Sequence, residues 1–138
     1  MSREALLRRI AVEERVTFRD AMDAALNDPD DGWYGAGKAS IGTGGDFTTS
    51  PELSPVFGAC IASWVARQWE RLRQPAVFHV VEFGAGKGSL ARAVLDTLRG
   101  EAPDAFGALR YVLVERSGAM RVHIREALAV HADRVEVL

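Results

Sequence analysis

The sequence has 138 residues, of which 48% are hydrophobic and 26% are charged, so it can bury one modest core and nothing in its composition forces disorder. Its 17 basic and 19 acidic residues nearly cancel, which excludes an overall field that would favour nucleic acid or a membrane surface. No apolar run approaches the ~20 residues of a membrane-spanning helix, and a single cysteine excludes an internal disulfide.

The first part of the chain is expected to be helical. Apolar residues at helical spacing predict a helix over residues 3 to about 14. Thr17 and Asp20 form a variant of the capping box, which predicts that a second helix begins there. This helix should end before the turn-forming residues 27–32. Its expected inward side chains are Phe18, Met22, Ala25 and Leu26.

Residues 32–50 are predicted to form a long loop. They include six glycines together with Trp33, Tyr34 and Asp46. Such a loop is either a flexible linker or a structure shaped around a ligand. The aromatic residues favour the second interpretation, because flexible linkers rarely contain them.

A long helix is predicted over residues 56–73, and Gln74-Pro75 should end it. Ser50 and Ser54, each followed by a proline, are candidate N-caps for this region. Core packing is the favoured role for its cysteine and its tryptophans, over a nucleophile or a cofactor box. The side that we expect to be buried comprises Val56, Cys60, Ile61, Trp64, Val65, Trp69 and Leu72.

The remaining residues alternate between strand and helix patterns. Buried strands are predicted over residues 77–83 and 109–114, and a third begins at Arg134. A helix that Gly100 closes and a helix over residues 118–130 separate them. This order predicts an α/β fold with a parallel sheet. Three strands are few for an open sheet, so we expect the chain to be the front part of a larger domain.

The turn Glu82-Phe-Gly84-Ala-Gly86-Lys-Gly88-Ser follows a strand and opens a helix, which is the context of a nucleotide-binding loop. Its glycines allow a sharp turn and let a ligand approach the backbone. A nucleoside triphosphate is excluded, because Gly88 stands where Ser or Thr should coordinate magnesium. The dinucleotide pattern fits formally from Gly86 to Ala91, so an NAD(P)-dependent oxidoreductase stays open.

S-adenosylmethionine (SAM) is the cofactor that the turn favours. Its amino group and sulfonium are positive, so Glu82 suits it, whereas that carboxylate would repel a pyrophosphate. Glu115, at the end of the second strand, could accept both ribose hydroxyls, although a solvated acid at a strand end is the alternative. No zinc-like cluster of His and Cys is present, and methyl transfer needs no metal, so none is expected.

One stretch resembles the signature of the MidA-like family of SAM-dependent methyltransferases, which includes the mitochondrial arginine methyltransferase of complex I assembly. The stretch is Gly44-Gly-Asp-Phe-Thr-Thr-Ser-Pro-Glu-Leu-Ser-Pro-Val-Phe-Gly58. Phe18-Arg-Asp, Asp31-Gly-Trp-Tyr-Gly35 and Val81-Glu-Phe-Gly-Ala-Gly-Lys-Gly88 are also similar to that family. The resemblance runs from about residue 16 to residue 121. Ala85, Lys87 and Ser89 depart from the Pro, Arg and Thr that are common in this turn.

The resemblance implies a Rossmann-like methyltransferase fold with a protein substrate. It divides the chain into an N-terminal extension (1–75) and the first part of the SAM-binding domain (76–138). Family members continue well beyond this length, so full activity is expected to need residues after Leu138. The location implied is the cytoplasm, or the mitochondrial matrix in a eukaryote. Implied cofactor contacts are Glu82, Gly84, Gly86 and Gly88 for the methionine part, Glu115 for the ribose, and Asp46, Phe47 and Thr48 over the cofactor or at the substrate entrance.

An acid is expected to orient the methyl acceptor and to accept or relay its proton. Asp46 is the candidate catalytic residue, and an Asx turn within the loop is the alternative role for it. Glu52 is a weaker candidate, since it suits the first turn of a helix. The histidines show no catalytic spacing: His79 should be structural, His123 should lie on a helix surface, and His131 should lie near the end of that helix. A non-catalytic assembly protein with this fold is the remaining alternative.

Overall fold

Three parallel strands form the centre of the fold, as predicted. The computed structural model describes residues 3–13 and 15–138. The strands lie in the order β1-β2-β3, with Phe78 opposite Leu109 and Tyr111 opposite Val135. The described elements are α1 (Arg3–Glu13), α2 (Phe18–Asn27), α3 (Ser50–Leu53), α4 (Pro55–Arg71), β1 (Phe78–Phe83), α5 (Ser89–Glu101), α6 (Pro103–Ala108), β2 (Leu109–Val114), α7 (Gly118–Ala127), the 3₁₀ turn η1 (Ala129–His131) and β3 (Val135–Val137).

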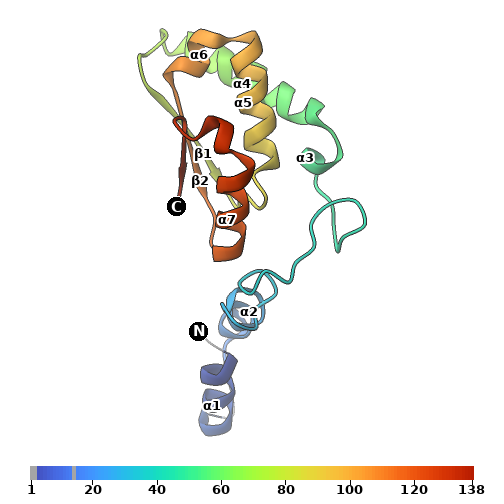
Figure 1. The fold of residues 1–138 in the computed structure, drawn as a ribbon. Helices are drawn as coiled ribbons and strands as arrows, with labels where there is room; N and C mark the ends of the chain where they lie inside the picture. Colours follow the sequence, from blue (N-terminus) through green and yellow to red (C-terminus); the bar gives the residue numbers. More distant parts are fainter. Residues whose placement is uncertain (1–2, 14) are drawn as a thin grey trace.

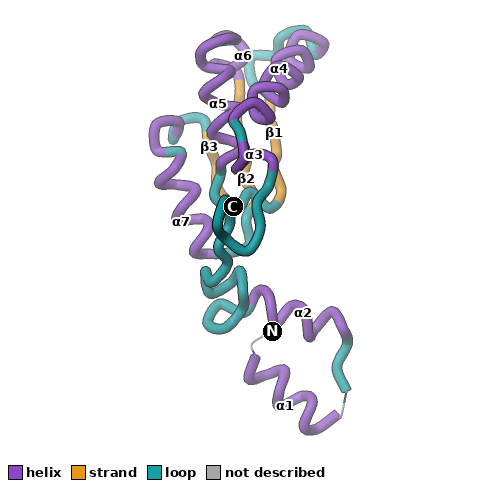
Figure 2. The backbone as a smooth tube through the Cα atoms, turned by 90° about the vertical axis from the view of Figure 1, so that its right-hand side faces the viewer, coloured by secondary structure: helices purple, strands orange, loops and turns teal. Residues whose placement is uncertain are grey.

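The core lies between one face of this sheet and the helices α4, α5 and α7. Every second residue of β2 is buried against them, because successive side chains of a strand point to opposite faces. On β1 the other face carries His79, Val81 and Phe83, all exposed, so the prediction of a strand buried on both sides was wrong. Figure 2 shows the three strands side by side with these helices around them.

The helix α2 lies away from the sheet together with α1 (Figure 1). Thr17 caps it as predicted, since its hydroxyl oxygen accepts a hydrogen bond from the backbone N–H of Asp20 at 3.1 Å. The predicted inward side was wrong: Phe18 is 79% exposed and Ala24 is the buried residue of the helix. The helix packs on α1, and the backbone N–H groups of Trp33 and Tyr34 donate to carbonyls at its C-terminal end, whereas its residues do not belong to the main core.

The helix α4 packs on α5 through small residues. A Cβ added at Gly58 would lie 2.3 Å from the Cβ of Ala93, so only glycine permits this close approach. The buried residues are therefore Gly58, Ala62 and Val65. Trp69 packs against the core as expected, and its Nε1–H donates to the carbonyl of Pro75. Larger apolar residues lie on other sides of the helix, away from α5. Burial was therefore predicted wrongly for four of them, which are exposed: Val56, Cys60, Trp64 and Leu72.

The helix ends are set by local hydrogen bonds. Ser54 caps α4, as predicted, by accepting from the N–H of Val56. Ser50 is the first residue of α3 and not its cap, because Thr49 has the extended conformation before it. Gly100 lies inside α5, which continues to Glu101 and ends just before Pro103.

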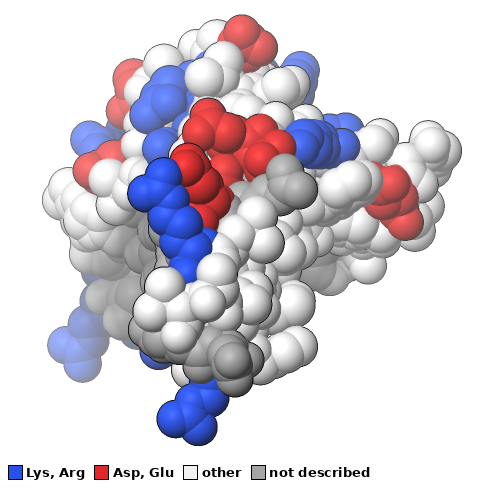
Figure 3. Space-filling model, turned by 90° about the horizontal axis from the view of Figure 1, so that it is seen from below, with Lys and Arg blue, Asp and Glu red and all other residues white. Residues whose placement is uncertain are grey.

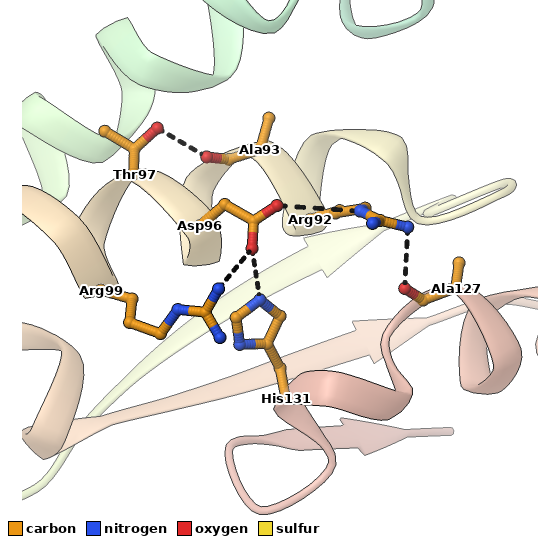
Figure 4. A network of polar contacts seen from close by, with 7 residues as sticks. All are labelled: Arg92, Ala93, Asp96, Thr97, Arg99, Ala127 and His131. Carbon is orange, nitrogen blue, oxygen red and sulfur yellow. Dashed lines mark hydrogen bonds and ion pairs between the residues drawn. The ribbon is translucent and has the colours of Figure 1, made fainter.

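His131 joins the end of η1 to α5. It is fully buried, and its Nε2 lies 2.8 Å from a carboxylate oxygen of Asp96, to which Arg92 and Arg99 also come close (Figure 4). Its ring stacks edge-on against Phe106. His131 lies near the end of the helix as expected, but its burial was not predicted, because the chain turns inward through η1 before β3. His123, in contrast, is exposed on α7.

Ion pairs contribute to the contacts of the N-terminal segment. Arg116, just after β2, lies 2.5 Å from Asp23 of α2, and Lys38 lies 3.6 Å from Asp31. Figure 3 looks at the molecule from below, the side of α1 and α2, and shows acidic and basic side chains next to one another. None of the helices in residues 3–13 and 15–138 is long and apolar enough to cross a membrane.

Candidate cofactor-binding site

A cavity of about 460 Å³ opens beside the residues that follow β1 and β2. This is the carboxyl edge of a parallel sheet, where open α/β folds bind their ligands. The volume lies within the range of about 300–1,000 Å³ of small-molecule sites. The glycine turn, the start of α7, and residues of the loop between α2 and α4 form its walls.

The glycine turn has the backbone that its sequence predicts. Gly84, Gly86 and Gly88 have φ of 68°, 57° and 80°, in the left-handed region that other residues rarely adopt. The N–H of Gly84 donates to the carbonyl of Val114, which holds the turn to the end of β2. A Cβ at Gly84 would meet nothing within 4 Å, so the space in front of the turn is open. Gly84 and Gly86 line the cavity, and Gly88 instead provides the N-cap position of α5.

Glu82 is the last residue but one of β1 and lines the cavity just before the glycine turn. The Tyr111 hydroxyl on the neighbouring strand donates to its carboxylate at 2.9 Å. Burial raises the pKa of Glu82, and this hydrogen bond partly opposes the rise. Burial, and next the negative charge of Glu82, also raise the pKa of Tyr111. A buried carboxylate of this kind gains from a cationic ligand.

Glu115 follows β2 and connects the two walls of the site. One of its oxygens accepts from the N–H of Gly86 at 2.9 Å, and the other accepts from the N–H of Ser117 at 2.8 Å. The residue therefore has a defined place at the cavity, unlike a solvated acid at a strand end. Each carboxylate oxygen can accept a second hydrogen bond, which leaves capacity for a ligand hydroxyl.

The loop brings only some of its predicted residues to the cavity. Phe47 lines it, whereas neither Asp46 nor Thr48 belongs to the lining. The carboxylate of Asp46 accepts from the N–H of Ser40 at 2.8 Å, six residues earlier, so it stabilises the loop but not through an Asx turn, which would use the N–H two residues later. The structure thus does not bring the predicted catalytic acid into the cavity. Glu52, the weaker candidate, does line it.

Sequence reasoning missed further residues at the cavity. Tyr34 and Ser117 line it, and the Ser117 hydroxyl donates to the carbonyl of Tyr34, which lies 83 positions earlier. Met120 comes from the first turn of α7, and Asn27 from the end of α2. Only the position of Ser117, two residues after a strand-end acid, could have indicated a role. The others depend on how the loop folds back on the sheet.

The donor set fits SAM. Carboxylates of Glu82 and Glu115 suit the ammonium and the ribose, and Phe47, Ile41 and Met120 give apolar walls. Among the described residues that line the cavity, Lys87 alone is basic, and its ammonium donates to the carbonyl of Ile41. In the part of the chain that the structure describes, no group of three or more His, Cys, Asp or Glu could hold a metal ion.

Comparisons with known proteins agree with this donor set. Residues 60–137 match the profile of a family described as "Putative S-adenosyl-L-methionine-dependent methyltransferase". The mitochondrial protein arginine methyltransferase NDUFAF7 homolog of Drosophila melanogaster is 38% identical over 99 residues, 72% of this chain and 22% of the relative. The Bos taurus protein of that name is 36% identical over 80 residues, 58% of this chain and 18% of the relative. The chain thus spans about a fifth of these curated relatives.

Solved structures are also similar. A COG1565 superfamily member from Burkholderia thailandensis, bound to S-adenosyl-homocysteine (SAH), superimposes with a TM-score of 0.78 at 33% identity. The match covers 98% of this chain and 36% of that one. A second structure from this superfamily and organism gives a TM-score of 0.70 at 31% identity, covering 98% and 33%.

Proposed function

Since the chain belongs to the family of S-adenosyl-L-methionine-dependent methyltransferases, we propose that the protein transfers a methyl group from SAM to an arginine side chain of a protein substrate. The observation that carries the proposal is the cavity at the carboxyl edge of the sheet, where the glycine turn meets Glu82 and Glu115. SAM, when bound, supplies a sulfonium methyl group. The residues of the chain bind and orient the reactants.

Each wall of the cavity has a part in this proposal. Glu82 accepts hydrogen bonds from the ammonium of the methionine part, and Gly84 and Gly86 let that part approach the backbone. Glu115 accepts the ribose hydroxyls. Phe47 excludes water from the reacting atoms, which strengthens the electrostatic interactions inside the site. Asp46 and Thr48 shape the loop that carries Phe47, and Gly88 starts α5 behind the turn.

The charges of the cavity argue against a dinucleotide. A pyrophosphate at the turn would face the carboxylates of Glu82, Glu115 and Glu52, and the single ammonium of Lys87 already donates to a backbone carbonyl. The same acidic lining favours a cationic acceptor such as a guanidinium, which carboxylates bind in a fixed orientation. The names of the curated relatives, protein arginine methyltransferases, support that acceptor.

We propose that residues 76–138 bind the cofactor and that residues 1–75 form an extension, whose loop at residues 32–50 covers the cofactor. Methyl transfer is expected to need residues beyond Leu138, since the relatives are about five times as long as the matched segment. The location proposed is the mitochondrial matrix in a eukaryote, which the word mitochondrial in the relatives' names supports, and the cytoplasm otherwise.

The acceptor is tested with SAM that carries a tritiated methyl group. Because methyl transfer is expected to need residues beyond Leu138, a form of the protein that continues past that residue is incubated with a cell extract from its own source, and the labelled proteins are hydrolysed to amino acids. The proposal expects the label in methylated arginine, and expects none with a Gly86→Val variant. Label in lysine, in nucleic acid or in a small molecule would contradict arginine as the acceptor, whereas SAM would still be the methyl donor.

A further inference from the structure

The loop segment of residues 41–53 is exposed along most of its length, yet it supplies one wall of the cavity. It begins with a closed loop in which Ile41 pairs with Phe47 and the N–H of Gly42 donates to the carbonyl of Phe47 at 3.0 Å. It ends in the single helical turn α3. Such a segment has few buried contacts to hold it, so its position depends on specific polar contacts.

Two side-chain contacts join this segment to the glycine turn. The ammonium of Lys87 donates to the carbonyl of Ile41, and the hydroxyl of Ser89 donates to the carboxylate of Glu52. A Cβ added at Gly42 would lie 3.6 Å from a carboxylate oxygen of Glu52 and 3.8 Å from the ammonium of Lys87, so the two opposite charges approach the same point. All these side chains are half-buried, where such contacts are worth more than on an open surface.

The spacing of the turn explains this arrangement. Gly84 and Gly86 leave the cavity side open, whereas Lys87 and Ser89, on either side of Gly88, carry side chains that reach the loop. A lysine in a cavity for a cationic cofactor would be unfavourable unless its charge were engaged. The carbonyl of Ile41 accepts a hydrogen bond from this ammonium.

We propose that Lys87 and Ser89 are positioning residues that fasten residues 41–53 to the glycine turn through Ile41 and Glu52, so that the turn and this wall of the cavity respond together to the cofactor. The inference rests on the proposed function, because it takes the cavity to be the SAM site. It assigns to Glu52 a structural contact with the turn, which its sequence position at the start of a helix did not suggest.

Hydrogen exchange of the ligand-free chain tests whether the contacts of Lys87 and Glu52 hold residues 41–53 in position when no cofactor is bound. Variants Lys87→Met and Glu52→Gln should exchange the amides of residues 40–53 about tenfold faster than the wild type, as expected for the loss of a charge-assisted hydrogen bond. Lys38→Met and Glu70→Gln are matched controls, since Lys38 pairs with Asp31 and Glu70 is exposed on α4. Equal exchange in all five proteins would overturn the proposal.

A double-mutant cycle isolates the contact between Ser89 and Glu52. The milder variant Ser89→Ala and the variant Glu52→Gln should each speed exchange of residues 40–53, and the double variant should be no faster than either, because both remove the same contact. Strictly additive effects would contradict a direct contact. Melting followed by circular dichroism confirms that each variant is folded.

Titration with SAH tests the coupling to the cofactor. SAH should slow exchange of residues 40–53 in the wild type, and Lys87→Met should lose this protection and bind SAH about tenfold more weakly. Unchanged affinity and unchanged protection in that variant would overturn the coupling. If the wild type bound no SAH while the ligand-free variants still exchanged faster, the proposed function would be contradicted. The contacts between the glycine turn and residues 41–53 would still be supported.

Discussion

The hydroxyl of Tyr111 donates a hydrogen bond to the carboxylate of Glu82 across the two neighbouring strands, at 2.9 Å. Tyr111 is almost fully buried, and Glu82 lies where the core gives way to the cavity. The pair thus links the core of the sheet to the acid that the proposed function assigns to the cofactor. It orients a carboxylate that burial alone would make unfavourable.

Replacing Glu82 by glutamine should weaken SAM binding by about ten- to hundredfold, because a charge-assisted hydrogen bond to the ammonium becomes a neutral one. The fold should remain, since the amide oxygen can still accept from Tyr111. Isothermal titration with SAM measures the affinity. Glu136→Gln, an exposed acid on β3, is the matched control and should bind like the wild type. Equal affinity in both variants would remove Glu82 from the site.

The pH dependence of SAM binding should follow Glu82. Its pKa in the folded chain lies above the ordinary value of 4.5, so the protonated form is favoured there. Its contribution to stability is therefore fully present below pH 4.5 and is lost as the pH rises through the raised pKa. A cationic ligand prefers the carboxylate, so affinity should rise over the same window.

The variant Tyr111→Phe tests this account of the pH dependence. Loss of the hydroxyl removes the hydrogen bond that stabilises the carboxylate, so the pKa of Glu82 should rise further. The midpoint of SAM affinity against pH should then move to higher pH, while affinity well above the midpoint changes little. A midpoint that stays in place or moves downward would show that another group controls binding.

The close packing of α4 on α5 gives a prediction about stability. Gly58→Ala should destabilise the fold by about 1–3 kcal/mol, because the new methyl group would overlap that of Ala93. Gly100→Ala, in open space inside α5, should stabilise it by about 0.5–1 kcal/mol. Urea unfolding measures both changes. Equal effects of the two substitutions would be incompatible with the described packing of α4.

The contact between His131 and Asp96 should stabilise the end of the described chain. His131→Ala removes a fully buried ring and its hydrogen bond, and should cost about 2 kcal/mol or more. SAM affinity should be unchanged, because neither residue lines the cavity. His123→Ala, exposed on α7, is the control and should have little effect on unfolding. If the two variants unfolded alike, the buried contact would contribute nothing.

Much of the sheet could be predicted from the sequence, because its signals are local. The run Leu109–Val114 forms β2 with the predicted bounds, and the glycine turn has the backbone that its spacing requires. The helix α6 was missed, since six residues beginning at Pro103 are too few for periodicity to reveal. It lies in the stretch that the pattern left without structure between Gly100 and Leu109.

Burial and the loop could not be predicted in the same way. The apolar residues of α4 lie on several sides of the helix, so their spacing does not show which side is buried. The close approach of Gly58 to Ala93 determines the side that faces α5. The pairing of Ile41 with Phe47 and the contact between Ser89 and Glu52 join residues that no periodic pattern connects. The roles of Asp46 and Glu52 therefore depend on tertiary structure.

Isothermal titration of the 138-residue chain with SAM and with NAD tests the central claim most directly. The account predicts that SAM binds, that NAD does not, and that Gly86→Val abolishes SAM binding, because a β-branched side chain disfavours the φ of 57° at the turn and would fill its open side. Gly107→Val, in open space within α6, is the matched control and should still bind SAM. Binding of NAD in place of SAM, or SAM binding that Gly86→Val leaves unchanged, would contradict the account.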